Sequence, residues 1–144
     1  MTLRRALDDP HVRASIAADA VTEAAAAVNE RSGLRGLAAQ LGLQTINQVR
    51  PGFLERHIHA MLPGMAEAIE PYWEAGLASG DPTAHLEMNA DEVSTQLLTV
   101  TDAYVDQAAD ARAIGVYQQL RARAPRRIAE QMPRVAAFIA RHTP

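Results

Sequence analysis

The chain has 144 residues, of which 48% are hydrophobic and only 4% aromatic, and its formal net charge is −3. It contains no cysteine, which excludes disulfides, thiolate metal ligands and a cysteine nucleophile. All fourteen basic residues are arginine, which also excludes a phosphate-binding lysine and Schiff-base chemistry.

The sequence carries no sign of a secretory signal or a membrane span. Arg4 and Arg5 are followed by acidic residues and Pro10 rather than by an apolar stretch. The longest uncharged run, residues 36–49, is interrupted by polar side chains and is shorter than the roughly 20 apolar residues that a span requires. We therefore expect a soluble, cytoplasmic protein.

The first half of the chain divides at helix start and stop signals. After a short opening turn over residues 2–8, Asp9 and Pro10 predict the start of a long helix that Gly33 would end. Two short helical segments, residues 34–41 and 43–49, are expected next. An apolar stripe over residues 53–62 predicts another helix, and Pro63-Gly64 either kinks this helix or starts a new one.

The second half repeats these signals. The next segment runs to Leu77, and Gly76 lies on its apolar face, where a missing side chain lets a neighbouring helix come close. Asp81-Pro82 is a second start signal, and Asn89 with Glu92 has the form of a capping box that predicts a helix from Ala90. Residues 111–142 are predicted to form two helices that meet near Pro125, the second bent by Pro133.

No segment alternates apolar and polar residues over the length of a strand, and no motif of 20 to 50 residues repeats itself. Each amphipathic helix must bury its stripe against other helices. The sequence therefore predicts one all-α domain over residues 1–144, a compact bundle of about six to eight helices with roughly three quarters of its residues in helix and no sheet.

Two histidines and a glutamate lie close together in the sequence and are candidate metal ligands. At 100° per residue His57 and His59 point about 200° apart on a helix, so they cannot chelate one ion together. Glu55 and His59 are four residues apart and could supply two ligands, which do not make a site. We therefore expect no bound metal and no cofactor, with His57 partly buried and His59 on the polar side of its helix.

Two carboxylate rows lie opposite apolar stripes and are interpreted as solvated acidic faces: Glu67, Glu70 and Glu74, and Asp102, Asp106 and Asp110. No serine lies in a nucleophile elbow, and no glycine-rich phosphate loop follows a strand. No catalytic residue is therefore assigned. Whether the protein is an enzyme stays open, with the balance against it.

Half of the aromatic residues and two of the five methionines gather in one part of the chain: Phe53, Met61, Met65, Tyr72 and Trp73. Such a set could line a pocket for a small apolar ligand. The simpler interpretation is core, because a chain with so few large side chains needs them for packing.

Charge is distributed unevenly along the chain. Residues 51–110 carry one arginine and eleven acids, whereas residues 111–144 carry seven arginines and one acid. Four of these arginines fall within about 40° of one another on an ideal helix: Arg123, Arg127, Arg134 and Arg141. We interpret this face as a surface that pairs with the acidic middle of the same chain or of a second copy, with plain solvation as the alternative. The acidic remainder disfavours nucleic acid and membrane.

The run from Ser32 to Gly76, together with residues 98–103, resembles a family of small, helical bacterial proteins of unknown function. Ser-Gly-Leu, Pro-Gly, Leu-Pro and Glu-Pro-Tyr-Trp occur in it in the family's order, and the likeness covers nearly the whole chain, although this chain lacks lysine throughout. The resemblance implies a helical fold and brings no activity. Two functions remain: a non-catalytic interaction module that associates with itself or with a protein partner, and a domain that binds a small apolar ligand near Trp73.

Overall fold

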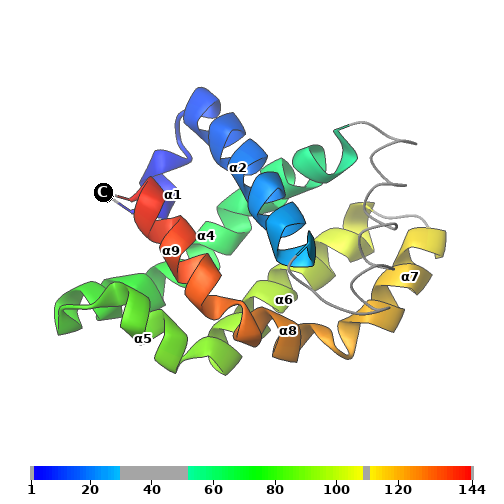
Figure 1. Cartoon of the computed structure of the whole chain (residues 1–144). Helices are drawn as coiled ribbons and strands as arrows, with labels where there is room; N and C mark the ends of the chain where they lie inside the picture. Colours follow the sequence, from blue (N-terminus) through cyan, green and yellow to red (C-terminus); the bar gives the residue numbers. More distant parts are fainter. Residues whose placement is uncertain (1, 30–51, 109–110, 144) are drawn as a thin grey trace. The chain divides into compact units, whose positions relative to one another are not determined.

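The computed structural model describes the backbone of residues 2–29, 52–108 and 111–143, and these are almost entirely helical (Figure 1). Eight helices lie in the described ranges, and no strand occurs there: α1 (Leu3–Ala6), α2 (Pro10–Asn29), α4 (Phe53–Ser79), α5 (Pro82–Met88), α6 (Ala90–Ala108), α7 (Ala111–Arg121), α8 (Ala124–Glu130) and α9 (Met132–His142). The all-α prediction is confirmed. The expected end at Gly33 and the segments 34–41 and 43–49 lie outside the described residues.

Contacts between residues group the chain into two compact units, Met1–Ala6 with Pro63–Pro144 (unit 1) and Leu7–Leu62 (unit 2). The boundary falls at Pro63, inside α4, which the structure assigns as one helix across the expected kink. A proline in a helix interior removes a backbone hydrogen bond, so this is a weak point of α4. The single domain expected from the sequence stays a prediction.

In unit 2, the start of α2 follows the sequence signal. An Asp9 carboxylate oxygen accepts hydrogen bonds from the backbone N–H groups of His11, at 2.8 Å, and Val12, at 3.4 Å. These groups have no partner inside the helix, and Pro10 precedes them with its φ preset. Ile16 and Ala17 are fully buried, whereas Val12 is 39% exposed, so the buried side of α2 begins after its first turn.

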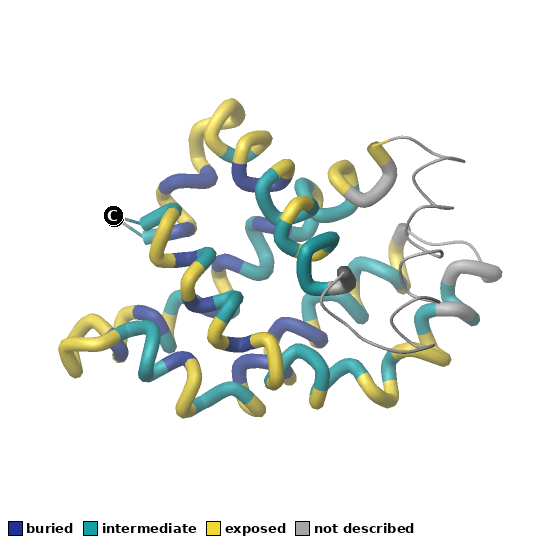
Figure 2. Tube along the Cα trace, in the orientation of Figure 1, coloured by how far each residue is buried: buried dark blue, intermediate teal, exposed yellow. Residues whose placement is uncertain are grey.

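Unit 1 has a core of aliphatic side chains around one tryptophan. Helix α6 packs on α8, and α5 packs on α9. Buried residues alternate with exposed ones along α5, α6 and α9, as one-sided burial requires, whereas α8 has half-buried and exposed residues (Figure 2). The least exposed large side chains are Leu86, Val93, Met132 and Ile139, with Ile69 and Trp73 from α4 beside them.

Glycines set the closest helix approaches in unit 1. A Cβ on Gly76 would lie 2.5 Å from Cα of Pro82 and 3.0 Å from Cβ of His85, so only glycine allows α5 to pack at this point of α4. The close approach expected at Gly76 is therefore confirmed. At Gly64 a Cβ would lie 3.0 Å from a methyl group of Val100 in α6.

The connections between α4, α5 and α6 are held by hydrogen bonds between residues close together in the sequence. Gly80 has a φ of +96°, and the Asp81 carboxylate that follows it accepts from the backbone N–H of Ala84 at 3.0 Å, which starts α5. Helix α6 begins at Ala90 as expected, but the Asn89 side chain donates to the carbonyl of His85 at 2.8 Å. Asn89 therefore closes α5 with its amide, rather than capping α6 with its side chain.

The last third of the chain differs from the expectation. Residues 111–142 form three helices rather than two, because a break at Gln131 separates α8 from α9. Pro133 lacks a backbone N–H, and its ring clashes with a carbonyl one turn earlier, so the helix ends where a bend was expected. The expected arginine face is thus divided, since Arg127 lies in α8 and Arg134 lies in α9.

Candidate functional site

The basic and acidic segments of unit 1 are joined by a polar network between α6 and α7. The Asp102 carboxylate accepts from the Arg121 guanidinium in a forked arrangement, from Nε at 2.9 Å and from a terminal nitrogen at 3.1 Å. The Tyr117 hydroxyl donates to the same carboxylate at 2.6 Å and lies 2.7 Å from the Thr101 hydroxyl. Forked, charge-assisted hydrogen bonds fix orientation, so the network anchors α7 to α6.

The network shifts the titration of its members away from neutrality. The hydrogen bonds from Arg121, and then that from Tyr117, lower the pKa of Asp102. Burial, and then the hydrogen bond to Asp102, raises the pKa of Tyr117. A carboxylate held ionised and a phenol held protonated serve as structural partners rather than as an acid–base pair working near pH 7.

A second tyrosine–carboxylate pair joins α4 to α6. Burial raises the pKa of Tyr72, and a hydrogen bond to Glu92 adds to the shift. Two of the acids on α6, Glu92 and Asp102, are therefore engaged within unit 1. Of the row expected to be solvated, Asp106 is exposed, and the Asp102 side chain is 41% exposed but is also engaged by Arg121, which the sequence did not predict. Asp110 lies outside the described residues.

The residues tested as metal ligands lie in the unit 2 part of α4. Glu55 is exposed, and His57 and His59 are half-buried. Within the described ranges, no three or more histidine, aspartate or glutamate side chains come together as a metal would require. None of the helices described is long and apolar enough to cross a membrane.

The aromatic and methionine set is divided between the units. Phe53 and Met61 belong to unit 2, whereas Met65, Tyr72 and Trp73 belong to unit 1; the Phe53 side chain lies outside the description. Trp73 is buried, and the space beside it in unit 1 is about 10 Å³. That volume holds about one water molecule, whereas small-molecule sites occupy roughly 300 to 1,000 Å³. The described surroundings of Trp73 therefore do not support a ligand pocket.

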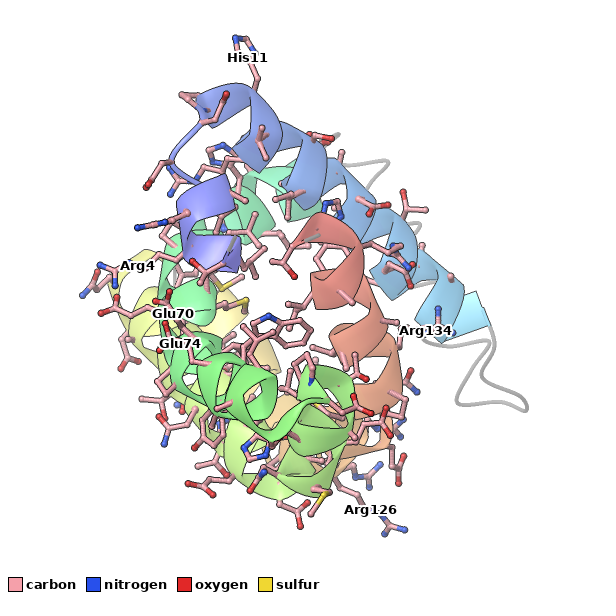
Figure 3. The ribbon with its side chains drawn as sticks, turned by 90° about the vertical axis from the view of Figure 1, so that its left-hand side faces the viewer. Arg4, His11, Glu70, Glu74, Arg126 and Arg134 are labelled. Atoms are coloured by element: carbon pink, nitrogen blue, oxygen red, sulfur yellow. The ribbon has the colours of Figure 1, made fainter. Side chains whose placement is uncertain are left out.

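One acidic row is preserved on α4. Glu67 and Glu74 are exposed, and Glu70 lies between them on the same stripe. The guanidinium of Arg4 approaches the Glu70 carboxylate at 3.5 Å, and in Figure 3 these two residues and Glu74 lie along one edge of the view. The Arg4 side chain is 62% exposed and the Glu70 side chain 20% exposed. A pair open to solvent on the arginine side contributes about 1 kcal/mol at most, so it shows which charge this face attracts more than it stabilises the fold.

The opposite charge is concentrated at the turn from α7 to α8. We define the arginine surface as Arg123, Arg126 and Arg127 with Leu120, whose carbonyl accepts from the Arg123 N–H at 3.2 Å. Leu120 is 66% exposed. Arg126 pairs with Glu130 one turn later at 3.1 Å, but its side chain is still 89% exposed.

The structure divides the four arginines of the predicted face. Arg123 and Arg127 belong to the arginine surface, where Arg123 is exposed and Arg127 is half-buried. Arg134 is half-buried in α9, and the guanidinium of the exposed Arg141 lies 5.5 Å over the Phe138 ring. Sequence reasoning missed Leu120 and Arg126. The signal was available at Pro125, which starts a short helix and so places the preceding leucine at a helix end.

Comparison with known proteins gives a family and nothing more specific. A family model described as "Family of unknown function (DUF6918)" matches residues 3–143. No curated protein and no solved structure matches the chain.

Proposed function

The chain belongs to this family of unknown function, and we propose that it is a non-catalytic, cytoplasmic interaction module that associates with itself through the arginine surface. The observation that carries the proposal is the exposure of Leu120 among three arginines in a chain whose formal net charge is −3. Exposed arginine beside exposed apolar surface is the composition that protein interfaces favour.

Charge supports a protein partner over nucleic acid. Residues 51–110 have a formal charge of −10, and part of this segment, α5 and α6, packs against the helices that carry the arginines. At physiological ionic strength the screening length is about 8 Å, so a long polyanion bound at the arginine surface would be repelled by nearby carboxylates. A folded partner with a short acidic patch avoids most of this repulsion.

Four ionisable groups whose pKa values differ from their usual ones are poorly suited to acid–base catalysis, which supports a non-catalytic role. Hydrogen bonds lower the pKa of Asp81 and of Asp102, and burial raises that of Tyr72 and of Tyr117. A general acid or base works best with a pKa near the working pH. All four of these groups move away from it.

Sedimentation velocity tests the proposal. At low salt the protein is expected to sediment as species larger than one chain, and the variant Arg123→Gln/Arg126→Gln/Arg127→Gln as a monomer. The control Arg5→Gln/Arg134→Gln/Arg141→Gln loses the same charge elsewhere and is expected to associate like the parent. A parent protein that stays monomeric, or that binds duplex DNA with a steep salt dependence, would overturn the proposal.

A further inference from the structure

The arginine surface and the acidic row of α4 lie on different sides of unit 1. In Figure 3, Glu70 and Glu74 lie along the left edge, whereas Arg126 lies at the lower edge and Arg134 on the right. All of these residues belong to unit 1. A contact between Arg126 and this part of α4 therefore requires a second copy of the chain.

The outer face of α4 is acidic and therefore complementary in charge to the arginine surface. At 100° per residue, Glu67, Glu70 and Glu74 fall within about 60° of one another, and their Cα atoms span about 10 Å along the helix. Pro71 is exposed beside this row, about 40° from Glu67 and about 100° from Glu70. This face, which we call the α4 face, is thus an apolar proline ring at the side of three carboxylates.

The acids of α6 do not offer an equivalent site. Glu92 is engaged by Tyr72, and Asp102 is engaged by Arg121 and Tyr117. The exposed acids Asp91 and Asp106 are fifteen residues apart, which is about 22 Å along a helix. Two carboxylates at that separation cannot both meet one turn of α8.

The two surfaces match in pattern as well as in charge. Each has one exposed apolar side chain, Leu120 or Pro71, beside charges mainly of one sign, with Glu130 at the arginine surface and Arg4 at the α4 face as the exceptions. Such a centre excludes water, and ion pairs at its rim set orientation and specificity. Arg4 already places a guanidinium on Glu70, which shows that the α4 face accepts this group within one chain.

We propose that the arginine surface of one copy docks on the α4 face of a second copy, with Leu120 against Pro71 and the arginines beside Glu67 and Glu74. This inference builds on the self-association proposed above. Because the two surfaces lie on different sides of unit 1, the contact is heterologous, and each bound pair leaves one arginine surface and one α4 face open. Assembly therefore continues beyond a dimer.

Two complementary variants test the docking. The first is the arginine variant Arg123→Gln/Arg126→Gln/Arg127→Gln, and the second is Glu67→Gln/Glu74→Gln, which leaves the Arg4–Glu70 pair in place. Each is expected to be monomeric alone, because it lacks one of the two surfaces. An equal mixture retains one intact contact, so it is expected to give a species of two chains and nothing larger.

A control variant separates position from total charge. Glu87→Gln/Asp106→Asn removes two exposed acids outside the α4 face, and it is expected to assemble like the parent. If Glu67→Gln/Glu74→Gln also assembles like the parent, self-association stands and docking on the α4 face is wrong. A parent that stops at two chains, or a mixture that stays monomeric, overturns the head-to-tail contact. A parent that never associates overturns the proposed function itself.

Leu120→Ala tests the apolar centre without changing charge. Only a minority of interface side chains cost about tenfold or more in affinity when truncated, and these lie near the centre of the interface. Because Leu120 is the proposed centre, we expect a loss of about tenfold. The loss should be similar at low and high salt, whereas the effect of Glu67→Gln/Glu74→Gln should shrink as salt rises. Unchanged assembly of Leu120→Ala would overturn the docking of Leu120 on Pro71.

Discussion

The crossing of α4 with α5 and the turn from α7 to α8 use similar residues in opposite ways. Each combines a glycine, a proline and a leucine, yet at the crossing Gly76 touches Pro82, and Leu86 of α5 is fully buried. In α7, before the turn, a Cβ on Gly115 would meet no atom of the described residues within 4 Å, and Leu120 is mostly exposed. Contacts, rather than residue types, therefore distinguish the region that stabilises unit 1 from the region that is available to a partner.

Arginines repeat the contrast over a few residues. Arg121 donates a forked pair of hydrogen bonds to Asp102, whereas the Arg126 side chain, in the next helix, is 89% exposed. The first guanidinium is needed to hold α7 on α6. The second is exposed at the surface, with Glu130 beside it.

Alanine substitution at Gly76 is expected to change stability more than the same substitution at Gly115. Gly76→Ala places a methyl group 2.5 Å from the Pro82 backbone, so α5 must move, and we expect a loss of about 1 to 3 kcal/mol in the free energy of unfolding. Gly115→Ala is the matched control in α7. Its methyl group meets no atom of the described residues, and we expect a gain of up to about 1 kcal/mol from helix propensity. Urea unfolding of both variants measures the difference, and equal effects would contradict it.

Removal of the Asp102 charge tests whether Arg121 has the structural role that Arg126 lacks. Asp102→Asn weakens the hydrogen bonds from Arg121 and Tyr117, and we expect a loss of about 1 kcal/mol, kept small by the partial exposure of the ion pair. Asp106→Asn is the control on the same helix, because Asp106 is exposed. We expect it to change the free energy of unfolding by less than about 0.5 kcal/mol. A larger effect at Asp106 than at Asp102 would contradict the structural role of the network.

The smallest effect concerns the pH dependence of this same contribution. Because the pKa of Asp102 is lower in the folded protein, its stabilisation is present above the unfolded pKa of about 3.9 and is lost as the pH falls through the folded pKa. The difference in unfolding free energy between the parent and Asp102→Asn should therefore stay constant from pH 7 to pH 5 and shrink below pH 4. Unfolding curves at pH 7, 5 and 3.5 measure it, and a difference that grows in acid would contradict the assignment.

Local signals in the sequence determined much of the fold. Asp9-Pro10 and Asp81-Pro82 start helices because a carboxylate satisfies free backbone N–H groups and proline needs no such partner. The absence of strand periodicity predicted an all-α chain, and the position of Gly76 on an apolar face predicted a close helix approach. Each of these inferences depends on residues within one or two helical turns, where spacing alone decides geometry.

Tertiary structure decided which charged and apolar residues are engaged. The sequence placed Asp102 in a solvated row, but Tyr117 and Arg121 reach it only because α7 turns back on α6. Four arginines at helical spacing predicted one face, but the break at Gln131 left Arg127 and Arg134 on separate helices. Periodicity describes a single straight helix, whereas exposure depends on which helices end, turn and pack, and that decision is made by contacts between residues far apart in the chain.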